Sequence, residues 1–265
     1  MYKIGIFDSG VGGLTVLKEV EKLFPSSTII YFADNANSPY GDKTGEEIKE
    51  LCLKIAHFLY SQKVDAIVIA CNTATAAAFQ AIKDKFNIPI IGVIEPGVKT
   101  ALDSTSNGKI SVLATPATVN LNAYKKIFEK LAPDNYEISQ RGCKLLCPMI
   151  EEGWHETYSK YFTHELISLY LEGIPADTDT LILGCTHYPL IKEDISELFH
   201  KTIIDPAHET VLELKRALKE ITPKHSFLIP ITDFVVSGDI NKFRKLAERF
   251  LNRKINNIIK INLNS

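Results

Sequence analysis

Apolar and polar positions form two kinds of segment along the chain. Short runs rich in β-branched residues predict buried strands, at 3–7, 28–32, 66–70, 88–93, 109–114, 180–183 and 234–236. Between them the apolar positions recur with helical spacing, at 14–23, 46–60, 75–85, 118–131, 158–171, 191–199, 209–220 and 241–250. This alternation is typical of an α/β protein with doubly wound parallel sheets. Ligands of such sheets bind beyond the carboxyl ends of the strands, so the residues that follow each run are the first candidates for a site.

Two stretches of the chain resemble each other and indicate an internal repeat. The residues VDAIVIACNT at 64–73 are matched by TDTLILGCTH at 178–187, with an Asp before each strand and a Cys after it. Upstream, KIGIF at 3–7 is answered by KISVL at 109–113. We therefore predict two related α/β lobes.

Two breaks in the pattern predict where the lobes meet. One lies near Pro96 and Gly97, and the other lies near Asp205 and Pro206. They predict a first lobe of residues 1–97 plus 206–265, to which the last segment of the chain returns, and a second lobe of residues 98–205.

Composition narrows the class of protein. The chain has 265 residues, of which 45% are apolar, and 30 Lys and Arg against 32 Asp and Glu give a formal net charge of −2. This near-neutral charge argues against nucleic acid as the main partner and against binding to an anionic membrane surface. The sequence shows neither a signal-peptide pattern nor the run of about 18 apolar residues that a membrane span needs. We expect a cytoplasmic protein with free thiols rather than disulfides.

The sharpest chemical feature is a cysteine after each of two equivalent strands. Cys71 and Cys185 are both followed by small or hydroxyl-bearing residues, so we expect each to lie near a helix N-terminus, which favours a thiolate. The two thiols could then exchange protons with a ligand. The alternative is that both are buried packing residues, because free cysteine packs well in apolar surroundings.

The other cysteines give a weaker signal. Cys52 lies in a helical pattern, and we interpret it as a packing residue. Cys143 and Cys147 lie four apart in an apolar stretch, and their spacing is only a weak indication of a metal site. A zinc site made of Cys71, Cys185 and His187 is conceivable, but the spacing lacks the paired ligands that structural zinc sites use. The sequence therefore predicts no metal site.

A glycine-rich turn follows the first strand. Its sequence, DSGVGG at 8–13, allows close backbone approach, but Thr15 replaces a glycine of the dinucleotide fingerprint and no P-loop is present. Nucleotide binding is therefore disfavoured. Asp8 could receive an ammonium group or hold a proton-transfer partner, or it could cap the helix that follows.

Further polar residues at strand ends could bind a small ligand. Tyr40, in a loop of turn-forming residues, could place its hydroxyl over the ligand. Neutral hydrogen-bond donors suited to a carboxylate follow three of the strands, namely Ser9, Asn72, Thr73 and Thr186. His187 could exchange a proton with Cys185. Glu151 and Glu152 are expected to be solvated, although one could approach the second thiol.

Taken together, these motifs resemble those of the glutamate racemases, in the cofactor-independent aspartate/glutamate racemase superfamily. The matching segments are ordered over nearly the whole chain: DSGVGG at 8–13, PYG at 39–41, ACNTATA at 70–76, GVIEPG at 92–97, ATPATV at 114–119, GCTHYPL at 184–190 and GDINKFRKLAERFL at 238–251. Two features depart from the family pattern. One is the loop before PYG, and the other is Cys147, which stands where an apolar residue is usual.

The resemblance implies a fold and a set of site residues. It implies two pseudo-symmetric lobes with the active site between them, and Cys71 and Cys185 as the two catalytic acid/base residues. Asp8, His187 and Glu152 are implied to assist, Glu152 near the second cysteine. The residues implied to line the glutamate site are Asp8, Ser9, Pro39, Tyr40, Gly41, Asn72, Thr73, Thr186 and His187.

The resemblance also implies an activity and partners. It implies interconversion of L-glutamate and D-glutamate without a cofactor, in a homodimer, with D-glutamate supplied to peptidoglycan synthesis. Pyridoxal phosphate is not expected, because no lysine lies at a comparable strand end. One alternative is a related isomerase or a racemase of aspartate or another acidic amino acid. Another is a binding module whose two lobes close on an amino acid without turnover.

Overall fold

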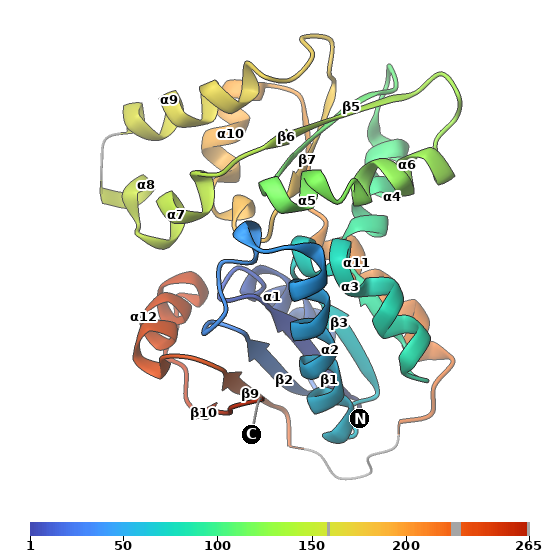
Figure 1. The fold of residues 1–265 in the computed structure, drawn as a ribbon, viewed down its shortest axis with the longest axis vertical. Helices are drawn as coiled ribbons and strands as arrows, with labels where there is room; N and C mark the ends of the chain where they lie inside the picture. The colour runs from blue at the N-terminus through green and yellow to red at the C-terminus, as the bar shows by residue number, and fades with distance from the viewer. Residues whose placement is uncertain (158–159, 224–228, 264–265) are drawn as a thin grey trace.

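The computed structural model describes residues 1–157, 160–223 and 229–263. The chain forms two lobes, each built on one parallel sheet (Figure 1). Both chain ends lie in the lower lobe of that view, which contains β1 to β3, and the segment that carries β9, α12 and β10 returns to it. This is the two-lobed α/β architecture that the sequence predicts.

The sheet of the first lobe has six strands in the order β10-β9-β2-β1-β3-β4. All neighbouring strands pair in parallel. The strands are β1 (Lys3–Asp8), β2 (Thr28–Ala33), β3 (Ala66–Ile69), β4 (Ile90–Gly92), β9 (Ile231–Val236) and β10 (Ile258–Lys260). The two central strands, β2 and β1, are buried on both faces, as expected of a sheet covered by helices on each side.

The sheet of the second lobe repeats the central part of the first. Its order is β6-β5-β7-β8, again all parallel, and it corresponds strand by strand to β2-β1-β3-β4. Its strands are β5 (Lys109–Ala114), β6 (Glu137–Gly142), β7 (Thr180–Gly184) and β8 (Thr202–Ile204). The hydrogen bonds at the starts of the equivalent strands match as well. The Asp65 N–H donates to the Lys3 carbonyl at 2.7 Å, and the Asp179 N–H donates to the Lys109 carbonyl at 3.0 Å. The internal repeat therefore extends over whole sheets.

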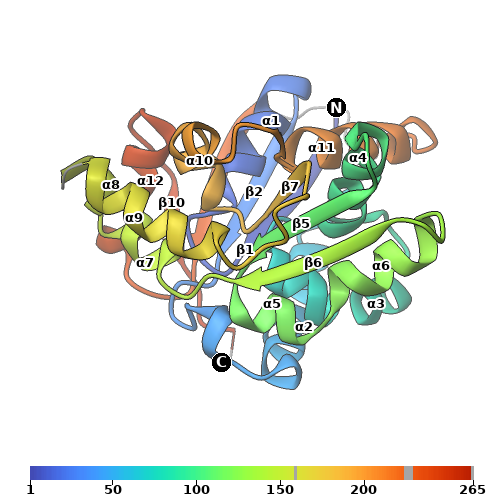
Figure 2. The same ribbon diagram turned by 90° about the horizontal axis from the view of Figure 1, so that it is seen from above.

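Helices cover the faces of both sheets (Figures 1 and 2). In the first lobe, Ile4 and Ile6 share a core with helices α1, α11 and α12, whereas Phe7 shares a core with α2 and α3. This follows from the alternation of side chains along a strand. The helices are α1 (Leu14–Leu23), α2 (Gly45–Ser61), α3 (Asn72–Lys85), α4 (Ile94–Ser104), α5 (Pro116–Asn120), α6 (Ala123–Leu131), α7 (Leu146–Glu151), α8 (Trp154–Thr157), α9 (Lys160–Leu171), α10 (Lys192–Phe199), α11 (Ala207–Lys219) and α12 (Ile240–Leu251), with 3₁₀ helices η1 (Tyr40–Asp42) and η2 (Tyr188–Ile191).

Several elements differ from the sequence-based expectation. Strand β6 was not predicted, because it is a sheet edge whose side chains are only partly buried and therefore lack an apolar run. The short strands β8 and β10 were missed as well. The predicted helix 118–131 is two helices, because Asn122 takes a left-handed conformation with φ of 54°. Residues 158 and 159 of the predicted helix 158–171 lie outside the described residues.

Helix α4 runs across the predicted boundary at residues 97 and 98. Its Pro96 lies in the first turn, where proline is tolerated because the N–H of that position has no partner inside the helix. Val98 and Ala101 pack in a core with strands of the second lobe. The strands of the two sheets come from residues 3–92 with 231–260 and from residues 109–204, and the exact lobe boundaries stay a prediction.

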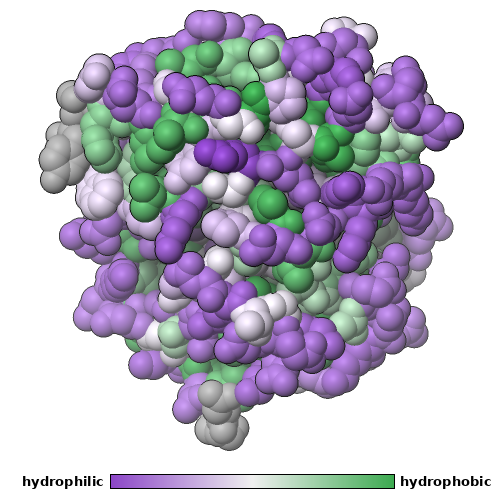
Figure 3. Space-filling view, turned by 45° about the horizontal axis from the view of Figure 1, so that its top comes forward, coloured by the Kyte–Doolittle hydropathy of each residue, from purple (hydrophilic) through white to green (hydrophobic). Residues whose placement is uncertain are grey.

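The surface is mixed in character. On the face in Figure 3, hydrophobic side chains lie in small patches separated by hydrophilic ones. In the described part of the chain, none of the helices has the length and apolarity required to cross a membrane.

Candidate active site

The carboxyl ends of strands from both lobes meet at one cavity of about 160 Å³. Its lining includes residues that lie within two positions of the ends of β1, β3, β5 and β7, as expected for parallel sheets. A larger hollow of about 450 Å³ lies against the first sheet and the 253–257 segment, and it contains none of the predicted site residues. The smaller cavity is lined by Ser9, Ser38, Pro39, Tyr40, Gly41, Asp42, Cys71, Asn72, Thr73, Thr115, Pro116, Cys143, Lys144, Leu145, Cys147, Pro148, Glu151, Cys185, Thr186 and His187.

Cys71 is the thiol that the first lobe contributes to the cavity. It is the N-cap of α3, and its Sγ accepts a hydrogen bond from the Ala74 N–H at 3.4 Å. The Ser9 Oγ lies 3.7 Å from the same sulfur. Burial, together with the negative charge of Asp8, raises the pKa of the Cys71 thiol to about 12, against the helix and the Ser9 bond. The predicted helix N-terminus is confirmed here.

Asp8 lies behind the wall of the cavity rather than in its lining. It is fully buried, and its carboxylate accepts hydrogen bonds from the Gly10 N–H at 2.8 Å and from the Thr186 hydroxyl at 3.4 Å. Burial raises its pKa, which the neighbouring His187 and two backbone N–H groups oppose. Asp8 thus connects the first lobe to the residue that follows Cys185.

The glycine-rich turn after Asp8 allows the two lobes to approach closely. A Cβ on Gly12 would overlap the side chains of Thr186 and His187. The hydroxyl of Thr15, one residue into α1, donates to the Thr186 carbonyl at 3.2 Å. The small residues of this turn are therefore explained by contact between the lobes.

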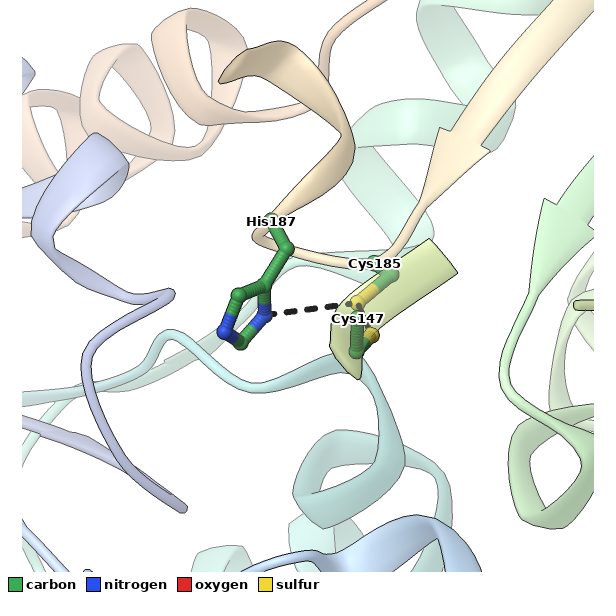
Figure 4. A group of neighbouring side chains, drawn as sticks. All are labelled: Cys147, Cys185 and His187. Atoms are coloured by element: carbon green, nitrogen blue, oxygen red, sulfur yellow. Dashed lines mark hydrogen bonds between the residues drawn. The ribbon is translucent and has the colours of Figure 1, made fainter. Parts of the chain in front are cut away.

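Cys185 is the thiol of the second lobe, and its surroundings differ from those of Cys71. Its Sγ lies 3.3 Å from the Cys147 Sγ and 3.7 Å from the His187 Nδ1. The hydrogen bond with Cys147 and burial raise the pKa of the Cys185 thiol, while His187 opposes the shift. Figure 4 shows the imidazole facing the two sulfurs.

The helix that follows Cys185 is not an α-helix, in contrast to the one that follows Cys71. The chain enters the 3₁₀ helix η2 instead, and α10 begins only at Lys192. The Tyr188 N–H donates to the Cys185 carbonyl and the Leu190 N–H donates to the His187 carbonyl, at 3.1 and 3.0 Å. These three-residue hydrogen bonds tighten the turn, so the imidazole takes the place of a helix terminus beside the second thiol.

The acidic partner of His187 is Glu151. Its Oε1 lies 2.9 Å from the His187 Nε2. The hydrogen bonds with Cys185 and Glu151 raise the pKa of His187 well above its ordinary value, although burial, the largest single influence, opposes them. Glu152, the residue expected near the second cysteine, is exposed and outside the cavity lining. It follows the last residue of the short helix α7, and the turn there directs only Glu151 toward the site.

The neutral donors predicted from the sequence all line the cavity. The Asn72 Oδ1 accepts a hydrogen bond from the Tyr124 hydroxyl at 2.7 Å, which fixes the orientation of the amide. The Thr73 hydroxyl lies 2.9 Å from the hydroxyls of Thr115 and Thr118. Residues of the second lobe therefore hold two side chains of the first lobe in place.

The loop that carries Pro39, Tyr40 and Gly41 forms another wall, but the tyrosine hydroxyl is engaged elsewhere. It donates to the Asp34 Oδ2 at 2.6 Å, in a buried pair. The expectation that this hydroxyl lies over the ligand is therefore not met, because the Asp34 carboxylate holds it. Asp34 also accepts from the Ser237 hydroxyl at 2.7 Å, which ties the loop to the returning C-terminal segment.

Several lining residues were not predicted as site residues, among them Thr115, Lys144 and Cys147. Thr115 follows β5 directly and caps α5 through a hydrogen bond from the Thr118 N–H. Its position after a strand was a usable signal. Lys144 and Cys147 follow the edge strand β6, whose weak pattern hid their position at a strand end.

The profile of the Asp/Glu/hydantoin racemase family matches residues 12–214. The chain belongs to this family. The family assignment agrees with the resemblance derived from the sequence motifs.

Individual relatives extend the match to nearly the whole chain. The glutamate racemase of Geobacter metallireducens is 39% identical over 268 residues, which cover 98% of this chain and 96% of that protein. The crystal structure of the glutamate racemase isoform RacE1 from Bacillus anthracis has a TM-score of 0.92 at 35% identity, over 99% of this chain and 98% of that one. The glutamate racemase of Francisella tularensis in complex with D-glutamate has a TM-score of 0.90 at 37% identity, over the same shares of both chains.

Proposed function

We propose that this protein is a glutamate racemase that interconverts L-glutamate and D-glutamate without a cofactor. The observation that carries the proposal is the placement of Cys71 and Cys185, one from each lobe, in the lining of a single cavity. Full-length similarity to glutamate racemases supports the choice of substrate.

Inversion at the α-carbon requires two proton-transfer groups on opposite faces of the substrate. One group removes the α-proton, and the other delivers a proton to the opposite face, so one is a thiolate while the other is a thiol. Two lobes that face each other supply such a pair. We assign abstraction from D-glutamate to Cys71 and abstraction from L-glutamate to Cys185, and the roles exchange with the direction of the reaction.

The two thiols reach the thiolate state by different routes. Asp8 opposes a second negative charge on Cys71, so the α-ammonium group of a bound amino acid, by compensating that charge, lowers the pKa of the thiol. On the other side, Cys185 donates its proton to His187 Nδ1, and Glu151 stabilises the resulting imidazolium. Asp8, His187 and Glu151 are thus positioning and proton-holding groups around the thiols.

Recognition of the substrate rests on the neutral donors and on one cation. Ser9, Asn72, Thr73 and Thr186 supply donors for the α-carboxylate, whose bonds strengthen as charge develops on the carbanion. The ammonium of Lys144, also in the lining, is available to the side-chain carboxylate. The cavity is smaller than the volume of about 300–1,000 Å³ that is typical of sites for drug-sized ligands. Its size therefore suits a small amino acid.

The biological setting follows from the same proposal. D-glutamate is supplied to peptidoglycan synthesis and hence to cell-wall formation, in the cytoplasm. We propose a homodimer as the working form.

The deciding experiment follows the α-proton of L-glutamate by ¹H NMR in D₂O, with purified protein and no added cofactor. We expect the α-proton signal to disappear and D-glutamate to accumulate. A persistent signal with glutamate but loss of the signal with aspartate would identify an aspartate racemase. If neither substrate exchanges and glutamate still binds after both thiols are alkylated, the protein is a binding module.

A further inference from the structure

A compact group of metal-ligand atoms surrounds the second thiol. The Cys147 Sγ, the Cys185 Sγ and a ring nitrogen of His187 all lie within 4.8 Å of one another. Figure 4 shows the three side chains converging on one point. The proposed racemisation uses Cys185 and His187 and gives Cys147 no role. The group also differs from the zinc site considered from the sequence, because its second sulfur belongs to Cys147 of α7 rather than to Cys71.

Two of the three separations are close to those of a tetrahedral centre. Zn²⁺ binds sulfur at about 2.3 Å and imidazole nitrogen at about 2.0 Å, which places two sulfurs about 3.8 Å apart and a sulfur about 3.5 Å from a nitrogen. The observed distances are 3.3 Å between the sulfurs and 3.7 Å between the Cys185 Sγ and the His187 Nδ1. Shifts of a few tenths of an ångström bring these two pairs to a metal-binding geometry.

The second nitrogen of His187 already has the partner that metal-bound histidines use. Glu151 Oε1 lies 2.9 Å from Nε2, so the Nε2–H donates to the carboxylate, and Nδ1, which faces the Cys185 sulfur, is the nitrogen that can bind a metal once it holds no proton. A carboxylate behind the imidazole fixes the tautomer and makes the ligand more basic. The arrangement therefore provides both the ligands and the residue that orients one of them.

The site is accessible from the substrate cavity. All three ligand residues line that cavity, and Cys147 is only partly buried. Two sulfurs and one nitrogen leave the fourth tetrahedral position for water or a substrate oxygen, as in zinc sites with an open position. Thiolate and imidazole ligands favour Zn²⁺ over Mg²⁺ and Ca²⁺.

We propose that Cys147, Cys185 and His187 bind one soft divalent cation, Zn²⁺ or Co²⁺, and that the bound ion inhibits racemisation by holding Cys185 as a metal thiolate. Binding releases the two thiol protons to solvent as the two metal–sulfur bonds form. The inhibition rests on the function proposed above, whereas binding of the ion does not.

The first test titrates the reduced full-length protein with Co²⁺ under nitrogen and follows the near-ultraviolet charge-transfer absorbance of Co²⁺–thiolate bonds. We expect saturation at one ion per chain. Cys147→Val is expected to weaken binding by more than the ~10–100-fold that loss of an outer partner of a metal ligand costs, and Cys147→Ala guards against a fold defect in the first variant. Cys52→Ala, which removes a buried cysteine outside the group, is expected to bind Co²⁺ as the parent does.

The second test measures glutamate racemisation with and without Zn²⁺ and compares the ratio of the two rates in each variant, so that a change in basal rate cancels. We expect Zn²⁺ to inhibit the parent and Cys52→Ala equally. The Zn²⁺ concentration needed to inhibit Cys147→Val should rise by the same factor by which this variant weakens Co²⁺ binding. Absence of a charge-transfer band in the parent, or unchanged Co²⁺ binding in both Cys147 variants, overturns the metal site. Loss of the band on Cys52→Ala also overturns it. Because Co²⁺ binding needs no turnover, an inactive protein that still binds one Co²⁺ through Cys147 contradicts the proposed function alone.

Discussion

The two thiols occupy equivalent places in the two lobes, yet their surroundings have little in common. Cys71 follows β3, caps α3 and lies near Ser9 and the charge of Asp8. Cys185 follows β7, precedes a 3₁₀ turn and lies against an imidazole and a second thiol. The repeat therefore fixes where the sulfurs are, and non-repeated side chains fix their electrostatics.

The origin of the difference lies in the segments that follow the edge strands. After β2 the chain forms the loop with Asp34 and Tyr40, whereas after β6 it forms the short helix α7 with Cys147 and Glu151. The first segment is hydrogen-bonded to Ser237 of the returning C-terminal segment, whereas the second packs against η2 and accepts hydrogen bonds from Arg249 of α12 at its carbonyls. The comparison teaches that a duplicated fold can place two similar nucleophiles and still tune them separately.

The largest effect is expected from removing either thiol. Cys71→Ser and Cys185→Ser should each reduce kcat for racemisation by at least about 10²–10⁴-fold, the contribution of a general acid or base. The comparison becomes sharper in D₂O, where Cys185→Ser should still exchange the α-proton of D-glutamate and Cys71→Ser that of L-glutamate, as measured by ¹H NMR. Full racemisation by both single variants would refute the assignment.

A matched pair of glutamates tests the imidazole side. Glu151→Gln should lower kcat/KM about tenfold, because a hydrogen bond to a charged group contributes about 1.5 kcal/mol. Glu152→Gln, one residue along and exposed, should leave kcat/KM unchanged. Circular dichroism at steady state measures both. The equilibrium between enantiomers is symmetric, so the loss must be equal in the two directions, and a greater loss in Glu152→Gln would reverse the assignment.

The pH profile separates the two sides. His187 holds its proton below its pKa, which Cys185 and Glu151 raise, so Glu151→Gln should lower this pKa and move the alkaline limb of kcat/KM to lower pH. Burial raises the pKa of the Cys71 thiol most, and the negative charge of Asp8 raises it further. Asp8→Asn should therefore lower that pKa and move the acidic limb to lower pH. Profiles that overlay those of the parent would show that neither carboxylate tunes its neighbour.

The smallest effect is expected at the edge of the cavity. Lys144→Met should raise KM for glutamate by at most about fivefold, as befits an exposed ion pair, with kcat unchanged. The effect should fade as ionic strength rises. Lys125→Met, on α6 and paired with Glu129, is the control and should leave KM as it is. An equal rise in both variants would indicate a general effect of charge.

The sequence was informative wherever a buried strand leads into the site. The parallel strands, the paired cysteines and the glycine-rich turn could be predicted from the sequence. A buried strand requires a run of apolar residues, and the residues at its end follow directly in the sequence. Strand β6 and the turn after Cys185 could not be predicted, because an edge strand has no apolar run and a 3₁₀ turn leaves little periodicity. The choice between Glu151 and Glu152 depended on a rotation of one residue at the end of α7, which no local pattern records.

The sequence by itself determined that the chain is a repeated α/β protein with one strand-end thiol in each half, since periodicity and residue order are local properties. Only the tertiary structure decided which side chains meet across the lobes. It directed Glu151 to His187, tied the Tyr40 hydroxyl to Asp34, and placed Cys147 beside Cys185. These contacts join residues from separate elements, and their positions follow from the packing of whole sheets and helices.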